Sequence, residues 1–221
     1  MILMHPTLER PIIFDDSVNV LIIENKDQLA DYITMLNSQI RGNDGAFVLS
    51  NEGKCLNISN CIKVIVDPFN LDINVKEVLT QVYISLNKIA MDEDHYCVTN
   101  EVMHSFLNYI AKLLVDADVE MDIKDCSMSD VIKLFSPKFI PSDDLLMTIT
   151  DYLDVMSRYS KCVLFVFVNL HALLSREKLC LLKQHILYHK YCVLFIEPSA
   201  YQYENDEDVV IIDENLCEIR R

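Results

Sequence analysis

Two uninterrupted runs of apolar residues in the C-terminal third form the strongest pattern in this sequence. They cover residues 162–168 (CVLFVFV) and 192–196 (CVLFI), and neither alternates polar with apolar positions. A strand of this kind is buried on both faces, as in a parallel sheet that is covered by helices. A helix-length segment that opens at Ser175 separates the two runs. The pattern therefore predicts a βαβ unit and an α/β core.

The N-terminal region adds shorter patterns of the same kind. Residues 18–23 (VNVLII) and 62–66 (IKVIV) have the pattern of strands, and residues 27–40 place apolar side chains on one face of a helix. All three glycines fall between positions 42 and 53, where we expect a loop that contains a short strand at 46–49.

Between these regions the apolar spacing becomes helical. Four helices are predicted, at residues 75–90, from Thr99 onward, at 128–135 and from Ser142 onward. The sequence therefore predicts an α/β head with a mainly parallel sheet, built from residues 1–70 and 158–221. An all-α leg, residues 71–157, is inserted into this head.

The net charge of −15 argues against a protein that coats nucleic acid by bulk attraction. It does not exclude a local basic channel, because only the field at the binding face matters there. The same charge favours surface cations such as calcium.

The eight cysteines are scattered, without a CxxC pair or a zinc-type spacing to histidine. Cys162 and Cys192 fall in the two buried runs and are interpreted as small core residues. The start of the chain lacks a signal-peptide pattern, and no run is long enough to span a membrane. We expect a cytoplasmic protein with reduced thiols and no membrane contact.

Motifs for hydrolytic chemistry are not found in the sequence. Glu24-Asn25-Lys26-Asp27 follows the first predicted parallel strand, where a phosphate-binding loop would need glycines, so no nucleotide is expected. His185 and His189 have the i, i+4 spacing of some metal ligands, but no glutamate lies between them as in a zincin. We interpret them as a surface pair on an amphipathic helix.

Acidic and apolar residues alternate after the second predicted leg helix. If the chain is extended there, its carboxylates share one face, and these are Asp116, Asp118, Glu120 and Asp122, with Asp125 close behind. Calcium takes six to eight oxygen ligands in flexible geometry and would relieve the repulsion along this row. The alternative is a solvated linker between helices.

Basic residues are few, so their grouping matters. Lys133 and Lys138 flank the end of the short helix at 128–135, and Arg158 and Lys161 precede the first buried run. Each group is either a candidate DNA-binding site or ordinary solubilising charge.

Four stretches together give the chain a family resemblance. They are residues 66–74 (VDPFNLDIN), 119–139 (VEMDIKDCSMSDVIKLFSPKF), 162–198 and 211–219 (IIDENLCEI). In order and spacing they resemble the ring-forming CRISPR adaptation proteins of type II-A systems, the Csn-two family. The chain departs from that pattern at Lys124, where relatives are acidic, and at Pro137, which precedes the second lysine.

The resemblance implies a head related to P-loop ATPases but without ATPase activity, and a homotetrameric ring that threads onto ends of double-stranded DNA. It implies calcium at Asp118, Glu120, Asp122 and Asp125, and lysines 133 and 138 near the central hole. It also implies spacer acquisition together with the CRISPR integrase pair and the RNA-guided effector nuclease.

Three hypotheses follow for the function. The first is a non-enzymatic, sequence-independent ring that binds DNA ends through Lys133, Lys138, Arg158 and Lys161. The second is a metal-dependent nuclease that holds two ions with the acids between positions 118 and 125. The third is a protein-interaction scaffold without DNA contact.

Overall fold

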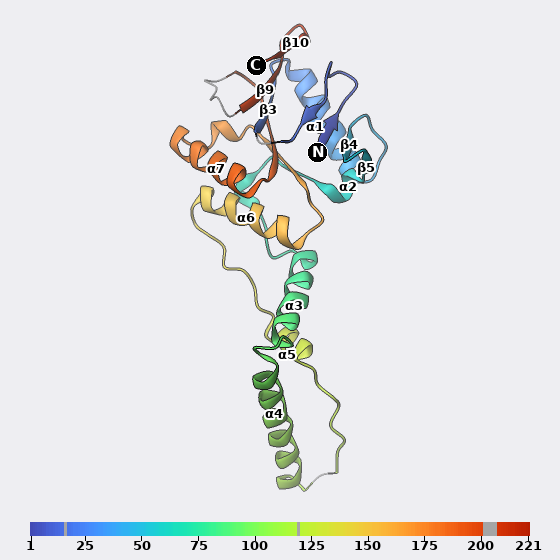
Figure 1. Cartoon of the computed structure of the whole chain (residues 1–221), viewed down its shortest axis with the longest axis vertical. Coiled ribbons are helices and arrows are strands. Elements are labelled where there is room, and N and C mark those ends of the chain that lie inside the picture. Colours follow the sequence, from blue (N-terminus) through green and yellow to red (C-terminus); the bar gives the residue numbers. More distant parts are fainter. Residues whose placement is uncertain (16, 119, 201–206) are drawn as a thin grey trace. The chain divides into compact units, whose positions relative to one another are not determined.

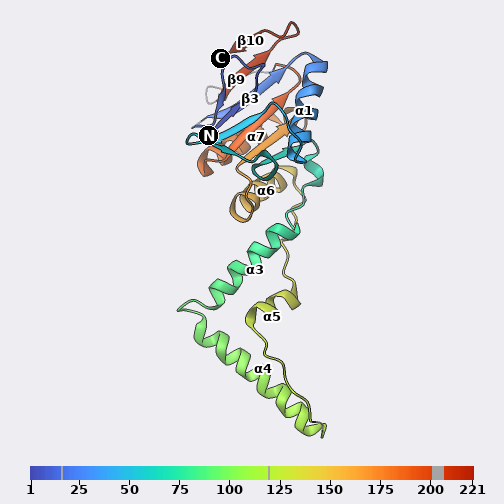
Figure 2. The same cartoon turned by 90° about the vertical axis from the view of Figure 1, so that its right-hand side faces the viewer.

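The computed structural model describes residues 1–15, 17–118, 120–200 and 207–221. These divide into two compact units, drawn from two sides in Figures 1 and 2. Met1–Asp72 and Pro141–Arg221 form the first, here called the α/β unit, and Ile73–Ile140 form the second, called the helical unit.

Six strands form the main sheet of the α/β unit, in the order β10-β9-β3-β8-β7-β6. They are β3 (Val18–Ile23), β6 (Ile62–Ile65), β7 (Leu164–Val168), β8 (Cys192–Glu197), β9 (Glu207–Ile212) and β10 (Glu218–Arg220). Edge strand β10 is antiparallel to β9, and every other pairing in this sheet is parallel. β3 and β7 are buried along their whole length, which confirms the α/β class and the mainly parallel sheet.

One face of this sheet is covered by α1 (Lys26–Ile40) and by a small second sheet. Leu21 and Val166 on this face share a buried core with Tyr32 and Leu36 of α1. The second sheet is antiparallel, in the order β2-β1-β4-β5, and comprises β1 (Ile2–Met4), β2 (Ile12–Ile13), β4 (Val48–Asn51) and β5 (Lys54–Leu56). The short helix α2 (Ile58–Cys61) leads from β5 into β6. The glycine-bearing loop thus belongs to this small sheet, in which the short strand predicted at 46–49 overlaps β4.

The opposite face carries α6 (Leu145–Tyr159) and α7 (Arg176–His189), which lie side by side in Figure 1. Successive residues of a strand point to opposite faces of the sheet, so Phe165 points away from the face on which Val166 lies. There its ring meets the ring of Tyr152 in α6 edge-on, with the ring centroids 6.1 Å apart. The 3-10 turn η2 (Leu170–Ala172) follows β7 and precedes α7.

The helical unit contains α3 (Lys76–Ala90), α4 (Tyr96–Asp116) and α5 (Met128–Phe135), and it follows the 3-10 turn η1 (Pro68–Asn70) of the α/β unit. α5 packs against α3, as Figure 2 shows. At the start of α4, Asp92 accepts hydrogen bonds from the backbone N–H groups of Asp94 and His95. These bonds close the turn between α3 and α4.

The helical unit is shorter than the predicted leg of residues 71–157. The fourth predicted helix is present as α6, but it belongs to the α/β unit. Its apolar stripe is buried there, through Ile149, Tyr152, Leu153 and Met156. The spacing of apolar residues predicted this helix correctly. It did not reveal that the helix packs on the main sheet.

All eight cysteines are free thiols. Cys162 is buried, and this burial raises the pKa of its thiol to about 12, so it is a core residue with little thiolate character. Within the described parts of the chain, no helix combines the length and apolar character that crossing a bilayer requires.

Candidate nucleic-acid interface and cation sites

Lys133 lies in the last turn of α5, and the local sequence explains why this helix forms. Ser127 and Asp130 make a capping box, in which each side chain bonds to the backbone of the other residue. Hydrogen bonds from Ser127 hold the pKa of Asp130 below its usual range, so this cap is charged at neutral pH. Ser136 adopts a left-handed conformation (φ 46°) and ends the helix. The Lys133 side chain is exposed.

The segment after α5 is anchored to α3 and to the residues just before it. Tyr83 donates from its hydroxyl to the carbonyl of Pro137 at 3.2 Å. Asn74 makes two bonds to Phe139, donating to its carbonyl at 3.1 Å and accepting from its N–H at 2.9 Å. Lys138 lies between these two anchored residues, so its backbone is fixed while its side chain is exposed.

A hollow of about 640 Å³ opens between α3 and α5. Lys133 lines it from α5, and Lys76 lines it from the first turn of α3, together with the polar side chains of Thr80 and Ser129. The two ammonium groups and the Ser129 hydroxyl can donate to a phosphate group, whereas the Thr80 hydroxyl already donates to the Lys76 carbonyl at 2.7 Å. Lys138 lies outside this lining. Lys76 was missed from the sequence, because only the packing of α5 on α3 brings it near Lys133.

Arg158 and Lys161 lie in the α/β unit, at the end of α6 and just before β7. Both are exposed, and the Arg158 guanidinium lies 5.2 Å from the centre of the Tyr159 ring. The structure thus places the four predicted DNA-binding residues as two pairs, one in each unit.

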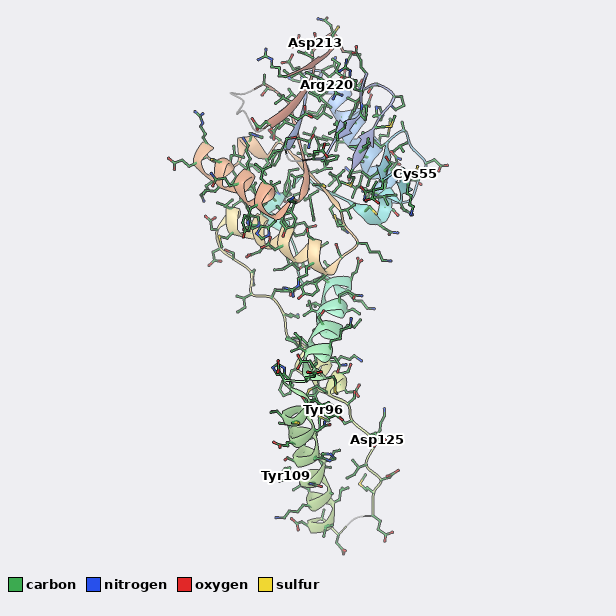
Figure 3. All side chains as sticks on the ribbon, in the orientation of Figure 1. Cys55, Tyr96, Tyr109, Asp125, Asp213 and Arg220 are labelled. Atoms are coloured by element: carbon green, nitrogen blue, oxygen red, sulfur yellow. The ribbon has the colours of Figure 1, made fainter. Side chains whose placement is uncertain are left out.

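The predicted calcium ligands follow α4. Asp118 is left-handed (φ 53°), and residues 120–127 form an irregular segment, on which Figure 3 labels Asp125. Val119, which opens one of the family-like stretches, lies outside the described residues. Glu120 and Asp122 line an open hollow against the end of α4, and all four predicted acids are exposed.

These four acids offer the hard oxygen donors that calcium prefers. In the described residues of the single chain, however, three or more potential metal ligands come together only at Asp154, His185 and His189, in the α/β unit. The acids at 118–125 are therefore not gathered around one point within one chain. A calcium site at these residues needs additional oxygen ligands or a rearranged segment.

The carboxyl edge of the main sheet has polar groups that hold the fold. Glu24 and Asn25 alone connect β3 to α1, and the Asn25 side chain accepts a bond from the Gln28 N–H at 3.0 Å and so caps the helix. The Glu197 carboxylate, at the end of β8, accepts from the N–H and the Nδ1 of His171 at 3.2 and 2.7 Å. This nearly buried pair fixes the turn η2 to β8, and no local sequence pattern predicted it.

α4 exposes a row of large apolar side chains. Val102, Phe106, Tyr109 and Leu113 recur at helical spacing, and each is between 44% and 59% exposed. Figure 3 labels Tyr109 and also Tyr96, at the start of the helix. The sequence predicted a helix with aligned apolar side chains here, and in the single chain this face is open to solvent. A continuous exposed apolar face of this kind is typical of a contact surface for another protein chain.

Comparison with known proteins gives three concordant similarities. A family model described as CRISPR-associated protein (Cas_Csn2) matches residues 39–216. The CRISPR-associated protein Csn2 of Streptococcus agalactiae is 22% identical over 161 residues, which are 70% of this chain and 73% of that protein. The crystal structure of Stu0660 of Streptococcus thermophilus has a similar fold, with a TM-score of 0.57 and 16% identity over 96% of this chain and 75% of that one.

Proposed function

The chain belongs to the Csn2 family of CRISPR-associated proteins, and from this premise we propose that it is a non-enzymatic ring that binds ends of double-stranded DNA. The binding is independent of sequence and serves spacer acquisition, the adaptation step of CRISPR immunity. The CRISPR integrase pair and the RNA-guided effector nuclease are its partners in this step.

The observation that carries the proposal is the pair Lys133 and Lys138. Both are exposed, the backbone on either side of Lys138 is fixed by Asn74 and Tyr83, and Lys76 lines the same hollow as Lys133. Such lysines contact phosphates and read no bases. In a chain with a net charge of −15, DNA binding depends on lysines being concentrated on one surface.

Assembly into a homotetramer multiplies this basic surface. Two lysines from each of four chains give about eight phosphate contacts, a number at which electrostatic attraction dominates the affinity. The apolar row on α4 supports assembly, because it is a surface that a second copy can cover. Arg158 and Lys161 form a second candidate contact with DNA.

We assign the α/β unit the role of a scaffold, with an ancestry among P-loop ATPases but without a nucleotide. Only two residues connect β3 to α1, so the chain has no loop long enough to cradle phosphates at this helix N-terminus. Glu24 would also repel a phosphate there. We further infer a cytoplasmic location, since eight free cysteines suit a reducing compartment.

Calcium is proposed to stabilise the ring through Asp118, Glu120, Asp122 and Asp125, with further oxygen ligands from a second copy. Lys124 is a departure from the family's acidic pattern and reduces the negative charge of this segment. We expect a chelator to lower the solution mass from that of a tetramer to that of a smaller species, and calcium to restore it. Light scattering after gel filtration measures this change, and a monomer unaffected by either reagent would contradict the calcium-stabilised ring.

A comparison of linear and covalently closed circular duplexes tests the function itself. A ring threads onto ends, so a gel shift is expected with linear DNA and not with the circle, and it should weaken steeply as salt rises. The incubation contains magnesium, manganese or calcium. Cleavage of either DNA would favour the nuclease hypothesis instead, and binding to neither would favour a scaffold without DNA contact.

A further inference from the structure

Three metal-binding side chains meet between α6 and α7, and none of them is assigned to DNA or calcium. Asp154 comes from α6, and His185 and His189 come from α7, one helical turn apart. One ligand atom from each lies within 4.8 Å of the others. Both helices belong to the α/β unit, so this meeting point is defined within one compact body.

Neighbouring contacts hold these groups in place. The Asp154 Oδ1 atom lies 2.7 Å from His185 Nε2 and accepts a hydrogen bond from the Tyr191 hydroxyl at 2.8 Å. The two imidazole rings are 4.4 Å apart between centroids, and His189 stacks on Tyr191 with an interplanar angle of 11°. His189 is exposed, so an ion can reach the cluster from solvent.

The donor set identifies the class of ion. Two imidazole nitrogens and one carboxylate oxygen suit zinc and its neighbours among the transition metals, whereas calcium and magnesium prefer oxygen ligands throughout. From this convergence we propose that Asp154, His185 and His189 bind one Zn²⁺ ion, with water at a fourth position. Tyr191 is a positioning residue that orients the carboxylate through its hydroxyl, as outer-shell partners do at metal sites.

Small side-chain movements complete the site. In a tetrahedral site with zinc–ligand bonds of about 2.0–2.1 Å, the ligand atoms lie about 3.3 Å from one another, so Asp154 Oδ1 and His185 Nε2, which are 2.7 Å apart in the chain without the ion, move slightly apart when zinc binds. In that chain, an ionised Asp154 can only accept, so His185 Nε2 carries the hydrogen that points at it. Zinc takes the place of this hydrogen, and the neutral imidazole then carries its proton on Nδ1. The ion links α6 to α7 across one face of the sheet.

Binding of zinc to the full-length reduced protein tests the proposal, measured by calorimetry and by the absorption spectrum with Co²⁺ as a probe. We expect one ion per chain and no sulfur-to-cobalt charge-transfer band, since no cysteine takes part. Tyr191→Phe, which removes an outer-shell partner, should weaken zinc binding by about 10–100-fold, and His189→Ala and Asp154→Asn, which remove ligands, should each weaken it further. His104→Ala, which removes an exposed histidine from α4, should leave it unchanged.

Each contrary result overturns the three-ligand site. If Asp154→Asn binds as well as the natural chain, the two histidines alone hold the ion. A strong charge-transfer band would assign the ion to cysteines. His189 is exposed, so His189→Ala remains folded and informative even where Asp154→Asn does not. Because DNA binding is predicted to be unaffected by His189→Ala, failure here is distinguishable from failure of the proposed ring.

Discussion

Replacing Lys133 and Lys138 together by glutamate is expected to abolish binding of linear duplex DNA while the number of subunits stays the same. Both side chains are exposed, so the exchange leaves the core intact. Across four chains, about eight favourable phosphate contacts become repulsive, and we expect the affinity at low salt to fall at least about 10³-fold. Fluorescence anisotropy with a labelled duplex measures the affinity, and light scattering measures the mass.

The matched control exchanges the same number of charges elsewhere. Lys54 in β5 and Lys112 in α4 are exposed and belong to neither basic pair. Glutamate at both should keep the affinity within about ten-fold of the natural chain, because neither lysine is proposed to contact DNA and an exposed charge is largely screened beyond about 10 Å. Equal losses in the two double variants would show that net charge, and no particular surface, governs binding. The milder change of Lys133 and Lys138 to alanine should flatten the salt dependence by about one unit of slope per lost contact.

A second large effect is expected from Lys183→Met, which should destabilise the α/β unit by about 3–5 kcal/mol. Lys183 reaches from α7 to Glu207, the first residue of β9, with its Nζ 2.8 Å from Oε1. The two side chains are only 5% and 0% exposed. Removing the lysine takes the ammonium group away from a carboxylate in the interior, and breaking a buried ion pair in this way is strongly destabilising. Urea unfolding followed by circular dichroism measures it.

The chain provides its own comparison for this buried pair. Lys178 and Asp144 form an ion pair of similar length, 2.6 Å, whose side chains are 42% and 45% exposed. Lys178→Met should therefore cost less than about 1 kcal/mol. Adding Glu207→Leu to Lys183→Met should recover most of the lost stability, because the buried carboxylate is then replaced by an apolar side chain as well. If the two lysine variants were equally stable, the interior pair would have no special importance.

The main sheet was predictable from sequence because its strands are buried on both faces. β7 and β8 have unbroken apolar runs that no solvent-exposed strand would carry. β1 and β5 have three residues each and lack a repeat long enough to recognise. The helical repeat of α6 predicted a buried stripe, but such a repeat carries no information about the partner. The same limit applies to α4, whose aligned apolar side chains do not reveal from sequence that they stay exposed in the single chain.

In the candidate sites too, residues close together in sequence could be predicted, whereas partners from distant parts of the chain could not. Lys133 and Lys138 stood out because basic residues are few and these two are close in sequence. Lys76 joins Lys133 only through the packing of α5 on α3. His185 and His189 were recognised as a pair but interpreted as surface residues, because Asp154 lies 31 residues before His185 on another helix. Contacts across such separations follow from tertiary packing, which no local pattern specifies.

The paired bonds between Asn74 and Phe139 have a consequence for how quickly the chain reaches its native state. β6 and β7 are neighbours in register, with Ile62 opposite Leu164, although the whole helical unit is synthesised between them. Bringing distant strands together carries an entropic penalty that grows with the length of free chain between them. If the helical unit folds first, the bonds between Asn74 and Phe139 hold its two ends together. The free chain between β6 and β7 then consists only of the stretch before Asn74 and the stretch after Phe139. We therefore expect the inserted helical unit to speed the pairing of β6 with β7, the two strands that flank it in sequence.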